Sequence, residues 1–251
     1  MEMFLAGVAA HIGPLLCVLL AAFLQSLTGF GLAIVTAPLL MLFYDPKVVV
    51  TVVLLLCLTG NLVQGFVNRK RARLRLVAWL FVGVLAGLPV GMLVFTACSS
   101  DGLKLLINGM VLFALTVMQL FRVRMQESKR NAVLTGLASG ITSATTGMAG
   151  PPFLLFIAHT RMKPQILRAT CFVFFLSCNF TALVAHMLGG QPMAAMIGEY
   201  VYLLPGLVLG ILLGNLLYPF MPKEWIRRFI YVLLYTTSIF GIGEVVYQWF
   251  L

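Results

Sequence analysis

The chain has 251 residues, of which 61% are hydrophobic and only 10% are charged. Soluble domains carry about 25% charged residues, so this composition excludes a soluble protein and predicts a chain solvated by lipid. The formal net charge of +10 would suit a nucleic-acid-binding protein. Nearly all basic residues, however, fall in four clusters at the ends of apolar segments. This pattern argues against nucleic acid as a partner and is typical of membrane topology.

The predicted elements occur in the same order twice along the chain. A long apolar stretch over 12–43 is interrupted at Thr28-Gly29, and three uninterrupted apolar segments follow it, at 48–67, 76–97 and 103–121. A second long stretch over 131–160 is interrupted at Thr146-Gly147, and three more segments follow it, at 166–187, 199–220 and 229–250. Each uninterrupted segment is long enough for a helix that spans a bilayer, which takes about 20 residues.

Individual residues also recur at a fixed distance of 118 residues. Thr28-Gly29 returns as Thr146-Gly147, and two further residues return with them, Pro46 as Pro164 and Asn61 as Asn179. A duplicated apolar unit with a broken helix in each copy is typical of secondary transporters. We therefore predict one all-α integral membrane domain built of two repeats, over 1–125 and 126–251.

The basic clusters predict the orientation of the helices. Positively charged loops face the cytoplasm, and the clusters are Arg69–Arg75, Arg122–Arg130, Arg161–Arg168 and Lys223–Arg228. The broken stretch 131–160 has a basic cluster at each end, so it must begin and end on the cytoplasmic side. We therefore predict a re-entrant hairpin there, and by the repeat a second one over 12–43 from the opposite face.

Each repeat is then one broken hairpin plus three transmembrane helices. Three is an odd number of crossings, so the two repeats have inverted topology. The alternative is that 12–43 and 131–160 each cross the membrane once. That arrangement gives eight spans and parallel repeats, and it places Arg161 and Lys163 outside the cytoplasm.

The two breaks are candidate anion-binding sites. A helix that starts inside the membrane presents free N–H groups and the positive end of its dipole, which attract anions. Pro151 and Pro152 suit such a helix start, because a missing N–H does no harm there. Candidate residues are the small and hydroxyl-bearing residues at the breaks, namely Thr28, Gly29, Gly31, Ser143, Thr146, Gly147, Ala149 and Gly150. The alternative role for these small residues is close packing of helices.

Four further polar residues lie within predicted spans. Asn61 and Asn179 occupy corresponding mid-span positions, where an amide either bonds another helix or contacts a substrate. Arg168 lies about one turn into its span and either attracts anions at the inner vestibule or extends to the lipid headgroups. Glu244 is an acidic residue inside a span, and it is either functional or neutralised by a neighbour.

Several of these motifs resemble one known family. Thr28-Gly29-Phe30-Gly31, followed by Pro38-Leu39-Leu40, is similar to the first signature of the TauE/SafE sulfite-exporter-like transporters. The segment from Gly147 to Pro152 is similar to the second signature, and other parts that resemble the family are Asp45-Pro46, Lys163-Pro164 and Arg168-Ala169-Thr170. The resemblance adds Phe30 and Met148 to the candidate substrate-binding residues. It implies transport of sulfite, a sulfonate or another organosulfur or carboxylate anion across a bacterial inner membrane.

The predicted function is therefore that of a permease that moves a small anion by alternating access. No phosphate-binding loop of the G-x-x-x-x-G-K-[ST] type occurs, so we expect no ATP hydrolysis, and protons are the candidate coupling ion. No nucleophile–base motif or metal motif occurs either, and we expect no enzymatic activity, no cofactor and no metal. Expected partners are the anion, the lipid bilayer and further copies of the chain in a homo-oligomer. The alternatives are an anion channel, a membrane subunit of a larger permease and, less favoured, an intramembrane enzyme.

Overall fold

We analysed a computed structural model of the chain. It describes residues 11–28, 32–68, 72–120, 127–157, 162–217, 220–221 and 223–249. All regular structure in these ranges is helical, as the composition predicted. The predicted all-α integral membrane protein is therefore confirmed as a fold class.

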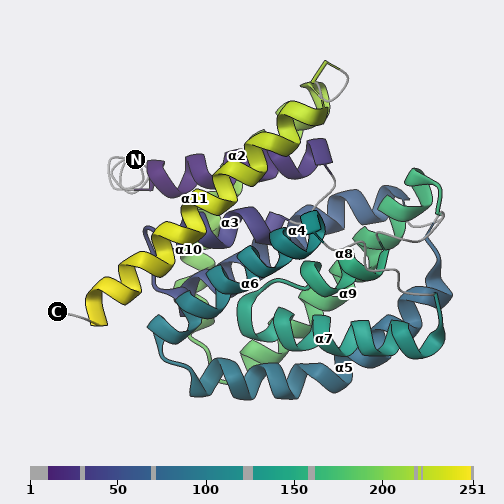
Figure 1. Ribbon diagram of the computed structural model, residues 1–251, viewed down its shortest axis with the longest axis horizontal. Coiled ribbons are helices and arrows are strands. Elements are labelled where there is room, and N and C mark those ends of the chain that lie inside the picture. Colours follow the sequence, from purple (N-terminus) through teal and green to yellow (C-terminus); the bar gives the residue numbers. More distant parts are fainter. Residues whose placement is uncertain are drawn as a thin grey trace.

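The first half of the chain contains a short broken pair of helices and then three longer ones, namely α2 (Ile12–Thr28), α3 (Leu32–Leu40), α4 (Pro46–Asn68), α5 (Leu74–Ala97) and α6 (Ser100–Leu120). The second half contains the same order, namely α7 (Lys129–Thr146), α8 (Gly150–Ile157), α9 (Pro164–Leu188), α10 (Met193–Leu217) and α11 (Lys223–Trp249). Figure 1 shows how these helices of the described residues are arranged.

Five of the described helices are long and apolar enough to cross a membrane, and they are α5, α6, α9, α10 and α11. They coincide with five of the six predicted uninterrupted spans. The sixth span lies in α4, whose apolar stretch in the described part is the shorter segment Pro46–Leu62. Large apolar side chains remain exposed on the outer faces, among them Leu93, Leu212 and Val232. Such faces require lipid around them, because a soluble protein rarely exposes so much apolar surface.

Rows of glycine bring two pairs of helices into backbone contact. On α5, Gly83, Gly87 and Gly91 face the backbone of α7, and a Cβ at Gly83 would lie 2.0 Å from the carbonyl oxygen of Val133. Figure 1 shows α5 and α7 side by side. Small residues of this kind let membrane helices approach closely, which maximises their van der Waals contact.

The corresponding pair joins α10 of the second half to α2 of the first half, which pack along each other. Gly206, Gly210 and Gly214 of α10 face Leu15, Leu19 and Phe23 of α2. In both pairs the two helices run in the same direction, because successive glycines meet successively later residues of the partner helix. Each broken hairpin is thus fastened along its first arm to one long helix.

Helices α4 and α9 pack against each other near the centre of the molecule. Arg73 follows the end of α4, and its backbone N–H donates a 3.1 Å hydrogen bond to Thr170 near the start of α9. The two helices therefore run in opposite directions. By contrast, α5 and α9 run in the same direction. Arg73 directly precedes the start of α5 and bonds to Thr170 near the start of α9. Phe95 near the end of α5 packs on His186 near the end of α9, with 4.4 Å between ring centroids.

The core is apolar and continuous. Phe153 of α8 stacks on Phe174 of α9 with 4.3 Å between ring centroids, and Phe175 meets Phe153 edge to face at 5.2 Å. Helix α3 is buried along its whole length, from Leu32 to Leu40. The second arms of both hairpins therefore lie inside the bundle, where irregular backbone can be shielded from lipid.

Candidate functional site

The break in the second hairpin lies at Gly147. Helix α7 ends at Thr146, and Gly147 adopts a left-handed conformation with φ of 72°, which only glycine takes easily. Its N–H donates a 3.0 Å hydrogen bond to the carbonyl of Ser143. Another carbonyl of the last turn, that of Ala144, is 2.8 Å from Nε2 of His186. The backbone at the break is thus bonded within the protein, as is required inside a membrane.

The break in the first hairpin lies between the end of α2 at Thr28 and the start of α3 at Leu32. This is where the sequence predicted the interruption. The predicted site residues Gly29, Phe30 and Gly31, and the side chain of Thr28, lie outside the described residues.

A buried pocket lies between the two hairpins and the helices α4 and α9. Its lining includes five predicted site residues, which are Asn61, Gly147, Ala149, Gly150 and Asn179. The other residues that line it are Gln25, Leu32, Ala33, Ile34, Cys57 and Phe175. The space open to the centre of a water-sized sphere is about 20 Å³, which is room for about one water molecule. In this conformation the pocket is closed around a very small volume.

Two helix starts reach this pocket, one from each half of the chain. Leu32, Ala33 and Ile34 are the first three residues of α3, and Ala149 and Gly150 stand at the start of α8. The first N–H groups of a helix have no partner within it, and the helix dipole places partial positive charge at this end. The pocket therefore has a positive potential without a cationic side chain.

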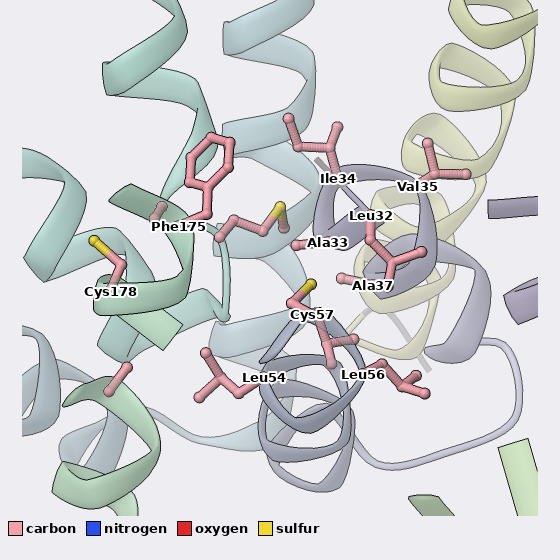
Figure 2. Close-up of a cluster of buried hydrophobic side chains, with 14 of the residues drawn as sticks. Leu32, Ala33, Ile34, Val35, Ala37, Leu54, Leu56, Cys57, Phe175 and Cys178 are labelled. Carbon is pink, nitrogen blue, oxygen red and sulfur yellow. The ribbon is translucent and has the colours of Figure 1, made fainter. Parts of the chain in front are cut away.

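Figure 2 shows the apolar surroundings of the pocket. Cys57 of α4 points towards Ala33 and Ala37 of α3, while Phe175 and Cys178 stand on α9 opposite them. All five side chains are buried. This apolar wall lowers the local dielectric, which strengthens any electrostatic interaction made beside it.

The polar part of the pocket consists of amides. Gln25, Asn61 and Asn179 are 4%, 3% and 3% exposed. Oε1 of Gln25 and Oδ1 of Asn61 are buried and find no hydrogen-bond partner among the described residues. No charged side chain lines the described part of the pocket. The site is thus polar but electrically neutral.

Four other predicted site residues do not line the pocket. The hydroxyl of Thr146 donates a 2.7 Å hydrogen bond to the carbonyl of Thr142, and Ser143 and Met148 are fully buried elsewhere in the core. Arg168 is half-buried near the start of α9. It lies eleven residues before Asn179, which is about 16 Å along a helix. The pocket therefore does not use its charge directly.

Six residues of the pocket were missed by sequence reasoning. Three of them begin α3, namely Leu32, Ala33 and Ile34, and the other three are Gln25, Cys57 and Phe175. The 118-residue repeat contains a signal for the last three. Cys57 and Phe175 are counterparts in that repeat, and Gln25 is the counterpart of Ser143.

The acidic residue Glu244 has a neighbour of opposite charge. Its Oε2 atom lies 2.7 Å from Nζ of Lys104, which joins the end of α11 to the start of α6. Of the two roles that the sequence left open for Glu244, the structure supports neutralisation.

Comparison with known proteins gives one match. The family described as sulfite exporter TauE/SafE matches residues 15–240 of the chain. No curated protein and no solved structure matches it. The matched range includes both helix breaks and every residue of the pocket.

Proposed function

The chain belongs to the TauE/SafE sulfite exporter family of membrane transporters, and we propose that it carries a small oxyanion across the membrane and binds it in the pocket between α3, α4, α8 and α9. Sulfite, a sulfonate or a related organosulfur or carboxylate anion is the proposed cargo.

One observation supports the site above all others. The starts of two short helices, one from each half, line the same buried pocket together with a pair of corresponding asparagines. Free N–H groups at a helix start bind oxyanions through hydrogen bonds and through the dipole. Transporters with broken helices bind anionic groups in this way at the interface of their repeats.

We propose that the two halves are inverted repeats, over 1–125 and 126–251, that alternate access to the pocket. The opposite directions of α4 and α9 favour inversion, because these helices occupy corresponding places in the two halves. The helix contacts also correspond, since α5 packs on α7 and α9 as α10 packs on α2 and α4. The pocket is too small for more than about one water molecule, so an anion requires its walls to separate.

The test of the site is transport by purified protein in lipid vesicles. Replacing Asn61 or Asn179 with alanine should raise the half-saturating sulfite concentration about 10- to 100-fold, because a hydrogen bond to a charged ligand is lost. Uptake of sulfite into vesicles, measured against sulfite concentration, gives this value.

The matched control is Asn108→Ala. Asn108 is equally buried, at 1% exposure, but it lies on α6 outside the pocket and donates to the carbonyl of Lys104. Its replacement should leave the half-saturating concentration unchanged. Equal effects at positions 61, 179 and 108 would contradict the site. A large single-channel current from the wild-type protein would instead indicate an anion channel.

The orientation of the loops can be tested separately through Lys163, which is exposed just before α9. We propose that it faces the cytoplasm. In intact cells, a membrane-impermeant maleimide should label Lys163→Cys, made in a Cys98→Ser background, only after permeabilisation. The wild-type Cys98, at the end of α5, should be labelled from outside and serves as the reference. Labelling of position 163 in intact cells would favour parallel repeats.

A further inference from the structure

The two unpartnered amide oxygens of the pocket limit which anions it can hold. Gln25 comes from α2 and Asn61 from α4, and both line the pocket. Both oxygens are buried without a partner among the described residues. A buried acceptor that stays unpaired carries a free-energy penalty, so the ligand must supply a donor if that penalty is to be relieved.

A fully deprotonated oxyanion cannot supply one. Its oxygen atoms only accept hydrogen bonds, so it can bond to the amide NH₂ groups and to the helix starts but not to the carbonyl oxygens. Its negative oxygens would also lie close to the amide oxygens in a dry pocket, where like partial charges repel strongly. A second negative charge would increase this cost, because no cation lines the described part of the pocket.

From these observations, and resting on the proposed function, we propose that the site selects a singly charged oxyanion that also donates a hydrogen bond. Hydrogen sulfite meets this requirement through its acidic proton, and a sulfonate meets it through a hydroxyl group. The oxyanion end binds the N–H groups at the starts of α3 and α8. The donor end binds Oε1 of Gln25 or Oδ1 of Asn61. Sulfate and simple alkanesulfonates can bind the N–H groups at the helix starts, but they offer no donor to the amide oxygens.

Other buried polar groups do not have this role. The hydroxyl oxygens of Thr36 on α3 and Thr51 on α4 are also buried without a partner among the described residues, but neither residue lines the pocket. They provide controls for the loss of a buried oxygen on α3 and α4, two of the helices that line the pocket.

The test compares three sulfonates of similar size on the purified full-length protein. The first is 2-hydroxyethanesulfonate, which has a donor, the second is ethanesulfonate, which has none, and the third is 2-methoxyethanesulfonate, which can only accept. Calorimetry should give at least about tenfold tighter binding for the hydroxyl compound than for either of the others. Equal affinities for the three compounds would overturn the proposal.

Sulfite provides a second measurement. Its binding at different pH values should follow the concentration of hydrogen sulfite, while sulfate should compete weakly at every pH. The proposal would be overturned if sulfite binding depended on the total sulfite concentration at every pH. It would also be overturned if sulfate bound as tightly as sulfite. These results are distinct from failure of the proposed function, which is absence of transport for sulfite and for all three sulfonates. Transport of all compounds with equal affinity would overturn only the selectivity proposed here.

Variants assign the selectivity to the two amides. Gln25→Met and Asn61→Leu remove one amide oxygen each with little change in volume, and in at least one of the two variants the preference for 2-hydroxyethanesulfonate should fall to about twofold or less. Thr36→Val should keep the full preference. A preference unchanged in both amide variants would overturn the assignment, and the comparison of ligands on the wild-type protein does not depend on the variants folding.

Discussion

Replacing Gly147 with leucine should reduce transport to background while the protein remains folded. Gly147 has φ of 72°, where a side chain costs about 1–2 kcal/mol. A Cβ there would also lie 3.2 Å from the carbonyl oxygen of Val50 and 3.6 Å from Cγ1 of Val53. The added side chain would therefore push the backbone at the start of α8 away from α4 and distort the pocket that Gly147 lines. Uptake into vesicles measures the loss of transport, and size-exclusion chromatography shows whether the protein remains folded.

Gly190 provides the matched control for backbone strain. It has nearly the same conformation, with φ of 77°, but lies in the exposed turn between α9 and α10 with no atom near its missing side chain. Gly190→Leu should therefore carry a similar strain and keep transport. Unaltered transport by Gly147→Leu would refute a pocket at this position. Equal loss of transport in both variants would show that strain alone is responsible.

Replacing Gly210 with leucine should prevent stable folding. A Cβ at Gly210 would lie 2.4 Å from the carbonyl oxygen of Leu19 and 2.7 Å from the Cβ of Ala22. Neither α10 nor α2 can yield locally, because the contacting atoms belong to backbone or to a side chain with no rotamer. The two helices must separate, and we expect a loss of about 3 kcal/mol or more. A lower melting temperature in detergent and a lower yield of monodisperse protein would record it.

Gly198 on the same helix separates this steric effect from helix propensity. No atom lies near its missing side chain, and it is exposed. Gly198→Leu should leave the melting temperature the same or higher, because leucine favours helix more than glycine by about 0.5–1 kcal/mol. If both variants melted at the wild-type temperature, the close packing of α10 on α2 would not be a source of stability.

The sequence allowed the order of helices and the position of the second break to be predicted, because both depend on local chemistry. Runs of apolar residues identify spans by length, and Gly147 lies where a helix must end in a left-handed residue. Asn61 and Asn179 were also singled out, since a lone amide in an apolar span is conspicuous. Both line the pocket.

The glycine rows on α5 and α10 were not predicted, for a reason that the structure makes clear. Gly83 and Gly206 face corresponding residues of the hairpin arms, yet they are 123 residues apart rather than 118. Helix α9 is two residues longer than α4, and Gly206 is the fourteenth residue of α10 whereas Gly83 is the tenth of α5. A search at one fixed spacing therefore pairs Gly83 with Val201 and overlooks the correspondence.

Other candidate site residues do not line this pocket, because residues close in sequence need not face the same way. Ser143 and Met148 lie within four residues of Gly147 on either side, but they point into other parts of the core. Each step along a helix turns the side chain by about 100°, so proximity to the break does not place a residue in the pocket. The repeat pairs Gln25 with Ser143, but only the packed structure shows that Gln25 lines the pocket.

The neutral lining of the pocket has an electrical consequence. When a singly charged anion crosses with no counter-charge from the described pocket residues, each turnover moves one negative charge through the membrane field. A potential of 100 mV does about 2.3 kcal/mol of work on that charge. With the usual inside-negative potential, this work drives the anion out of the cell. A binding site without a cation would thus make the resting voltage itself a driving force for export.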